Sequence, residues 1–268
     1  MTRYFLNRLV RRKLFWLAFA AGCAISAYYF VQDVWGQDLY ELSVYTMWIE
    51  SFTNSDVPAL LYSLVPLLSA VVAADLYLED KNSGYLNVVF SRSNPGSYFR
   101  TLYTINFLAG GLTLVLPLAL NLYLCFLVCP DRAPDLLAEG TNLLNPMGFD
   151  VLFPQMYYTH PFLQACIYIV LGFFAAGIFA TIGLALGCYV KHRFLVWIGP
   201  YMINYVFTAL STVVFGKSQY TLQSVYAMFY NNGEEVTAVK SAAVIGIWLL
   251  AATAFYWIGV KKNENSCI

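Results

Sequence analysis

Six long stretches of uncharged, mostly apolar residues recur along the chain and restrict what it can fold into. They are Leu14–Gln32, Val57–Ala74, Thr101–Cys129, Pro161–Val190, Phe194–Gly216 and Ser241–Val260. An α-helix needs about 20 residues to cross the hydrocarbon core of a bilayer, and each stretch is near or above that length. Strands of a membrane barrel would be about half as long and would alternate apolar with polar side chains. The pattern predicts an all-α polytopic membrane protein whose six transmembrane helices form one domain over residues 1–268.

The balance of residue types excludes several classes of protein. Hydrophobic residues make up 60% of the chain and charged residues only 11%, whereas a water-soluble domain carries about 25% charged residues. The formal net charge is zero, and the sequence has neither a basic domain nor the spacing of a zinc finger or an RNA-binding motif. These observations exclude a water-soluble fold and predict that the chain has no nucleic-acid partner.

Basic residues concentrate on one side of the predicted helices. Of the 15 Lys and Arg residues, most lie in the N-terminus, in the second-to-third connection, in the turn Lys191–Arg193 or in the C-terminal tail. The exceptions are Arg132, Lys217 and Lys240. Cytoplasmic loops of membrane proteins are enriched in Lys and Arg, so both termini are predicted to be cytoplasmic.

The first 13 residues form a basic, amphipathic segment ahead of the first apolar stretch. Aromatic and leucine side chains alternate there with Arg8, Arg11 and Arg12. A helix of this kind lies in the plane of a membrane surface and turns its basic side chains toward anionic headgroups. Residues 1–13 are therefore predicted to be an interfacial helix whose three arginines anchor the chain to the membrane surface. Docking of a cytoplasmic partner onto this helix is the alternative.

The connections on the opposite side of the membrane are acidic and rich in aromatic residues. Residues 32–56 contain five carboxylates, Glu50 among them, and aromatic side chains at helix-like spacing. Residues 217–238 carry Glu234 and Glu235 together with further aromatic residues. Both connections are predicted to contain interfacial or re-entrant elements on the outer side.

Arrangements of catalytic residues are missing from the sequence. Its two histidines, His160 and His192, fall on opposite sides of the predicted membrane. The triplet 216–218, Gly-Lys-Ser, matches the end of a phosphate-binding loop, but Ser211 stands where that loop requires glycine. The chain is therefore predicted not to be an enzyme and to bind no nucleotide, metal or other cofactor itself.

Charged residues are also missing from the middle of the predicted helices. Asp75 lies at the inner end of the second apolar stretch, beside Glu79 on the same helix face. Ion-coupled transporters carry ionisable residues within their spans, so coupling to an ion gradient is not predicted. If the chain moves a substrate, the energy has to come from another protein.

Four uncharged polar residues share one face of the fifth predicted helix. Asn204, Thr208, Ser211 and Thr212 stand at positions i, i+4, i+7 and i+8. Side chains of this kind form hydrogen bonds between membrane helices. The same face is also suited to line a translocation path or a dimer interface, and both interpretations stay open.

The connection over residues 80–100 is longer than a simple link between two helices requires. Residues 85–90, Tyr-Leu-Asn-Val-Val-Phe, form a short apolar, helix-like patch. Apolar residues in a water-facing position indicate a covered surface. Either the other helices of this chain cover the patch, or another protein does.

The stretch EDKNSGYLNVVFSRSNPGSYFRTLYTINFL, residues 79–108, resembles a segment of the permease subunits of bacterial ABC-2 type ABC transporters. In that family an acidic-glycine-Ser-Arg-Tyr-Phe pattern leads into the third helix. The resemblance implies that residues 80–100 form a cytoplasmic coupling element that docks on a separate ATPase subunit. The residues implied in coupling are Asp80, Tyr85, Ser91, Arg92, Asn94 and Tyr98, with Lys191, His192 and Arg193 at a second contact.

The resemblance also implies a function. It describes a permease of the bacterial plasma membrane that pairs with a second copy, most simply as a homodimer, and with two ATPase subunits that hold ATP and Mg. An oily interior without a ring of charges is suited to an amphipathic or hydrophobic substrate, such as a peptide. The size and layout are similar to exporters of phenol-soluble modulins, which are peptide toxins. A stand-alone immunity or scaffold protein that acts by binding is the alternative.

Overall fold

The computed structural model describes residues 1–36, 43–51, 55–92, 94–134, 152–215, 220–228 and 237–267, and those residues contain helices and no strand. Six helical segments in this part of the chain are long and apolar enough to cross a membrane. They are Lys13–Val34, Val57–Asn82, Pro95–Val128, Pro161–Gly187, Arg193–Val214 and Ala238–Asn263. Each overlaps one of the six predicted stretches, so the prediction of a helical chain with six helices of membrane-spanning length and apolarity is confirmed in the described residues.

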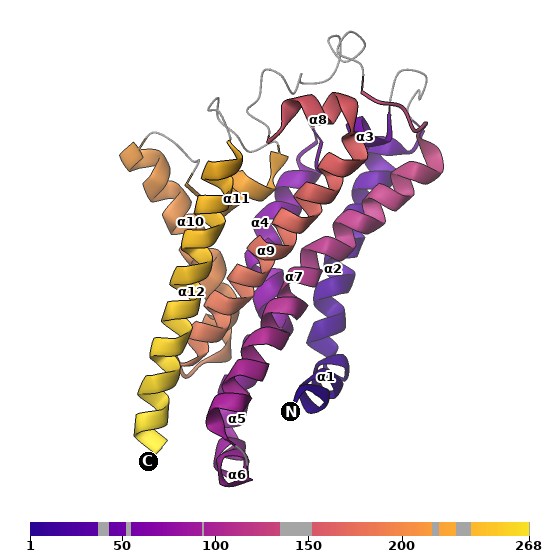
Figure 1. Ribbon diagram of the computed structural model, residues 1–268. Coiled ribbons are helices and arrows are strands. Elements are labelled where there is room, and N and C mark those ends of the chain that lie inside the picture. Colours follow the sequence, from indigo (N-terminus) through magenta and orange to yellow (C-terminus); the bar gives the residue numbers. More distant parts are fainter. Residues whose placement is uncertain are drawn as a thin grey trace.

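The helices that form these spans run side by side in one bundle (Figure 1). They are α2 (Lys13–Tyr29) with the π-helical turn η1 (Phe30–Val34), α4 (Val57–Ala73), α7 (Pro95–Val128), α9 (Pro161–Gly187), α10 (Arg193–Phe215) and α12 (Ala238–Cys267). Within the bundle α9 contacts α4, α7, α10 and α12. Most of its side chains are buried as a result.

Short helices gather at both ends of the bundle. The chain termini lie at one end with α1 (Thr2–Val10), α5 (Leu76–Asn82) and α6 (Tyr85–Arg92), which is the lower end in Figure 1. The opposite end carries α3 (Val44–Met47), α8 (Pro154–Thr159) and α11 (Leu222–Tyr226). We name the two ends inner and outer after the predicted orientation, which itself stays a prediction.

Close contact between α7 and α9 depends on small residues. A Cβ atom on Gly110 of α7 would lie 2.3 Å from the Cβ atom of Ala180 in α9. One turn farther along α9, a Cβ atom on Gly183 would lie 2.9 Å from the Cβ atom of Ala74. Small residues let membrane helices approach closely enough for backbone contact. The glycines therefore set the spacing of the three central helices.

Prolines within two of the spans take part in contacts between helices. Pro66 of α4 has no N–H to donate to the Tyr62 carbonyl four residues earlier. The hydroxyl of Tyr226 donates to that carbonyl at 3.3 Å. Pro117 of α7 packs against Gly22 of α2, where a Cβ atom would lie 2.7 Å from the proline ring. Both prolines are therefore part of the contacts between helices.

The amphipathic N-terminus forms a helix, as predicted, but its apolar face contacts protein. Phe5 and Leu9 of α1 are buried in the inner hydrophobic cluster, which also contains Tyr98 and Phe99 of α7. The helix ends at Val10, and α2 begins at Lys13 after an extended residue, Arg12. The face of α1 that carries Phe5 and Leu9 is therefore covered, whereas other side chains of the helix, Leu6 and Val10 among them, remain exposed.

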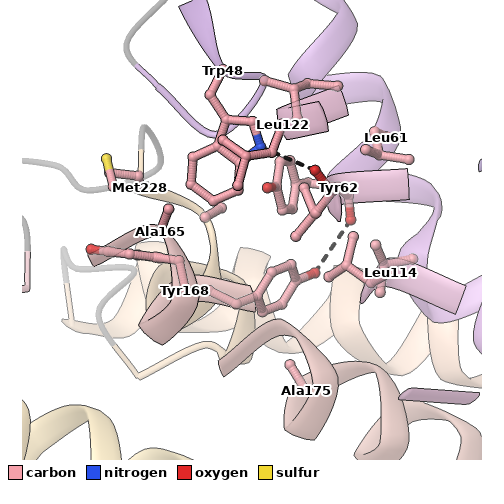
Figure 2. Close-up of a cluster of buried hydrophobic side chains, with 14 of the residues drawn as sticks. Trp48, Leu61, Tyr62, Leu114, Leu122, Ala165, Tyr168, Ala175 and Met228 are labelled. Carbon is pink, nitrogen blue, oxygen red and sulfur yellow. Dashed lines mark hydrogen bonds between the residues drawn. The ribbon is translucent and has the colours of Figure 1, made fainter. Parts of the chain in front are cut away.

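Two short segments close the outer end of the bundle. Residues 43–51, which include α3, and residues 221–228, which include α11, are buried throughout. Figure 2 shows Trp48 from the first segment packed near Tyr62 and Leu122 in the outer hydrophobic cluster, to which Met228 also belongs. We call these two segments together the outer plug. The remaining parts of the predicted outer elements, residues 37–42, 52–54, 217–219 and 229–236, lie outside the described residues.

Candidate functional site

The connection predicted over residues 80–100 is helical almost throughout. It contains the end of α5, all of α6 and the start of α7. Gly84 separates α5 from α6 with a φ of +72°, a conformation that glycine adopts without strain. The Asn94 side chain caps α7 by accepting from the Gly96 N–H at 2.9 Å, and Pro95 follows as the first helical residue. The apolar patch is therefore a separate helix, α6, at the tip of the inner end (Figure 1).

Other helices of the chain cover one face of α6 and leave the opposite face open. Leu86 and Val89 are buried in the inner hydrophobic cluster, and the ring of Phe90 packs against Phe99. On the outward face Val88 is 49% exposed. Helices of this chain therefore cover Leu86 and Val89, whereas Val88 stays exposed; coverage of Val88 by another protein stays a prediction.

A buried carboxylate joins α1, α5 and α7 behind α6. The Asp80 side chain accepts from the Tyr98 hydroxyl at 2.6 Å and from Nη1 of Arg8 at 2.5 Å. Asp80 and Tyr98 are both buried. These two residues were predicted to contact an ATPase, but the structure places them inside the molecule. There they fix α1 against the helices that flank α6.

A second set of ion pairs extends this contact toward the membrane. Nη2 of Arg12 donates to the fully buried Asp75 at 2.8 Å. Glu79 lies 3.3 Å from Nη2 of Arg8, 3.7 Å from Nη2 of Arg12 and 3.9 Å from Nη2 of Arg193. We call these six residues the inner charge network: Arg8, Arg12, Asp75, Glu79, Asp80 and Arg193.

The network changes the interpretation of the predicted membrane anchors. Arg8 and Arg12 bind carboxylates of their own chain. Burial opposes the charge on Arg8, but Asp80 more than compensates, and the pKa of the guanidinium is raised. Arg11 is exposed and makes no ion pair with the described residues. Among the three predicted anchors, Arg11 is the most exposed.

The remaining residues predicted for coupling lie at the same end of the bundle. Tyr85 stacks on Tyr4 of α1, with ring centroids 5.9 Å apart, and the Ser91 hydroxyl donates to the Val88 carbonyl within α6. Arg92 is the last residue of α6, and its side chain lies outside the described part. Lys191 and His192 are exposed between α9 and α10, and Arg193 is exposed at the start of α10.

The polar face predicted on the fifth span belongs to α10 and is partly engaged with the outer plug. Nδ2 of Asn204 contacts Oε1 of Gln223 in α11 at 3.5 Å. The Thr212 hydroxyl donates to the Thr208 carbonyl within the helix, and Ser211 is buried. Asn204 therefore joins two helices, while a role of this face in a path or a dimer stays a prediction.

The outer plug contains a buried carboxylate, Glu50, which belongs by sequence to the acidic outer connection over residues 32–56. Glu50 is fully buried, and its Oε1 accepts from the Met228 N–H at 2.8 Å. Its Oε2 has no hydrogen-bond partner among the described residues. Burial raises the pKa of this carboxyl well above its ordinary value, although the bond from Met228 acts in the opposite direction. Glu50 therefore joins the two halves of the plug.

Asn121 of α7 connects the outer plug to the spans. Its Oδ1 accepts from the Ile49 N–H at 2.9 Å, and its Nδ2 donates to the Ser26 carbonyl of α2 at 3.1 Å. Nearby, Nε1 of Trp48 donates to the Leu118 carbonyl at 3.2 Å. Buried backbone groups require such partners. Residues 43–51 are too short to pair all of their backbone groups within a helix, so the Ile49 N–H is paired with a side chain instead.

The sequence alone did not predict the inner charge network or the contacts of Glu50 and Asn121, although the spacing of charged residues gave a partial signal for the network. Arg8 and Arg12 are four residues apart, and so are Asp75 and Glu79. The spacing predicts Asp75 and Glu79 on one helix face, whereas Arg12 lies in the extended corner after α1 rather than on the helix of Arg8. The signal was present for the inner charge network, whereas Glu50 and Asn121 stand in segments with nothing to distinguish them.

Comparison with protein-family models, curated proteins and solved structures finds no match to this chain. Within the described residues, no group of three or more His, Cys, Asp or Glu side chains is arranged to hold a metal ion.

Proposed function

We propose that this chain is the membrane-spanning permease of an ATP-driven exporter and that a separate ATPase subunit docks on α6. The observation that carries the proposal is the form of α6, a discrete helix at the tip of the inner end. It is anchored on one face by Leu86 and Val89 and leaves Val88 exposed on the other. A helix held by the bundle on one face presents its other face outward in a fixed orientation, which suits it to dock on a separate subunit.

In this proposal, a force that the ATPase exerts on α6 is transmitted to the membrane-spanning helices. The buried face of α6 belongs to the same hydrophobic cluster as Tyr98 and Phe99 at the start of α7. The bonds from Tyr98 and Arg8 to Asp80 join α7 and α1 to α5. Because α5 follows α4 directly, movement of the ATPase would rock α1, α4 and α7 together. The outer ends of α4 and α7 contact the plug through Tyr62 and Asn121.

The proposal includes a membrane, a stoichiometry and a class of substrate. Two copies of the chain would pair in a bacterial plasma membrane with both termini in the cytoplasm, and two ATPase subunits would supply ATP and Mg. The substrate would be an amphipathic peptide taken from the inner leaflet. The apolar character of the spans supports such a substrate because a charged substrate would require charged residues there.

Co-purification tests the proposal directly. With a C-terminal tag and mild extraction, we expect an ATPase subunit in about equal amount by mass spectrometry. Val88→Glu should reduce its recovery about tenfold or more, because a charge at the centre of an interface removes on the order of 2 kcal/mol of binding. Arg92→Glu, at the end of α6, should abolish substrate-stimulated ATP hydrolysis while leaving membrane insertion intact.

A matched control is Val10→Glu, since Val10 is 52% exposed at the same end of the bundle but lies on α1. It should retain the ATPase. If Val88→Glu and Arg92→Glu both retain wild-type amounts of ATPase and of hydrolysis, α6 is not the docking site. If no ATPase accompanies the protein under several gentle detergents, the stand-alone immunity or scaffold protein becomes the better explanation.

A further inference from the structure

We propose that the inner end holds a specific binding site for the phosphate of an anionic phospholipid, between α1 and α5. A cavity of about 530 Å³ opens there. Its lining consists of Tyr4, Asn7, Arg8, Arg11, Arg12 and Glu79. Three guanidinium groups around one cavity are typical of phosphate recognition, because each presents several N–H donors in a planar fork.

The arginines around the cavity have donors left over from the inner charge network. Arg12 directs Nη2 to Asp75, but its Nη1 is buried and has no hydrogen-bond partner among the described residues. A buried guanidinium N–H without an acceptor is unfavourable. Arg11 makes no ion pair within the described part of the chain. An anion in the cavity would supply acceptors to Arg11 directly, and to Nη1 of Arg12 after a movement of that side chain, because this atom is enclosed.

The charges at this point of the molecule leave room for one negative group. The carboxylates Asp75, Glu79 and Asp80 are each matched by an arginine, as Arg8 and Arg12 pair with all three and Arg193 lies near Glu79. With Arg11 added, the arginines exceed the carboxylates by one. A phosphodiester carries one negative charge and would balance this excess. Glu79 therefore does not exclude an anion from the cavity.

The surroundings of the cavity favour a lipid over free phosphate. Leu6 of α1 and Leu17 of α2 are exposed apolar residues close to the arginines in sequence. Trp16 is 58% exposed, and its Nε1 donates to the Val10 carbonyl at 2.8 Å across the corner between α1 and α2. Tryptophan in such a position is typical of the headgroup level of a membrane. A ligand with acyl chains would contact this apolar surface, which inorganic phosphate would not.

Lipid titration of the purified protein tests the site. The probes are phosphatidylglycerol, phosphatidylcholine and inorganic phosphate, each followed by the rise in unfolding temperature and by lipid retention in native mass spectrometry. We expect phosphatidylglycerol alone to stabilise the wild type in a saturable manner. Arg11→Gln should weaken its apparent affinity about tenfold, because a hydrogen bond between charged groups contributes about 1.5–3 kcal/mol.

Lys13→Gln is the matched control, because Lys13 is exposed and basic, lies two residues from Arg11 and does not line the cavity. It should bind phosphatidylglycerol as the wild type does. Equal losses in Arg11→Gln and Lys13→Gln would mean diffuse surface attraction and would overturn the site. Equal stabilisation by phosphatidylcholine would do the same, and saturation by inorganic phosphate at the same concentration would overturn the lipid as its ligand.

Discussion

The two ends of the bundle are held together by different kinds of contact. At the inner end, side chains of opposite charge meet, as in Arg8 with Asp80 and Arg12 with Asp75. At the outer end, single polar side chains satisfy backbone groups of short segments, as Glu50 does for Met228 and Asn121 for Ile49.

The two kinds of contact differ in the stability that is lost when one partner is removed. Removing one partner of a buried ion pair costs about 3–5 kcal/mol, whereas removing one partner of a buried neutral hydrogen bond costs about 1–3 kcal/mol. The inner charge network, with the hydrogen bond from Tyr98 to Asp80, therefore joins α1, α5 and α7. The outer plug is attached by individually weaker bonds and is the part more easily displaced.

The largest expected effect comes from breaking the inner charge network at its most buried point. Asp75→Ala should lower the free energy of unfolding by about 3 kcal/mol, because Arg12 then stays buried beside Glu79 alone. Unfolding in mixed micelles measures the loss. The control is Arg11→Ala, an exposed arginine, with a change of about 0.5 kcal/mol or less. Similar unfolding curves for the two variants would contradict the comparison between the two ends.

An intermediate effect is expected when the outer plug loses its attachment to α7. Asn121→Leu leaves the Ile49 N–H without its partner and should cost about 1–3 kcal/mol. Cys125 reports on the same event, since its Sγ lies 3.6 Å from the Met47 carbonyl beneath the plug. We expect a membrane-impermeant maleimide to modify Cys125 faster in the variant, as located by peptide mass spectrometry.

The control for that measurement is Tyr123→Leu, an exposed position on the same helix. Labelling of Cys125 in this variant should match the wild type. Should Asn121→Leu label no faster than Tyr123→Leu, the plug does not depend on Asn121.

The smallest expected effect concerns Glu50, because Glu50→Gln retains the oxygen that accepts from Met228. An unfolded glutamate ionises near pH 4.5, whereas burial raises the pKa of Glu50 in the fold. The folded chain therefore binds this proton more tightly, and its contribution to stability falls as the pH rises from 4.5 toward the raised pKa. Glu50→Gln should gain stability relative to the wild type as the pH rises above about 4.5.

Thermal unfolding at several pH values checks this sign. Asp56→Asn, at an exposed carboxylate of the same connection, is the control and should follow the wild type throughout. A wild type that becomes more stable than Glu50→Gln as the pH rises would mean that the buried carboxyl is stabilised in its charged form.

The six spans, α1 and α6 could be predicted because each depends on a local pattern. Hydrophobic length and periodicity alone identify a membrane helix. The apolar residues near position 88 gave α6 in the same way. Glu50 could not be placed by such reasoning, because its burial depends on Met228, 178 residues away. Its immediate neighbours gave no indication of that contact.

The amino-acid sequence by itself determined that this chain is a helical membrane protein with a basic end and an acidic end. Only the tertiary structure decided which charges meet, turning Arg8 and Arg12 from membrane anchors into partners of Asp80 and Asp75, 72 and 63 residues away. The physical reason is the separation along the chain of the groups that interact. Spans form through bonds within a few residues of each other, whereas ion pairs and the outer plug require helices distant in sequence to have packed first.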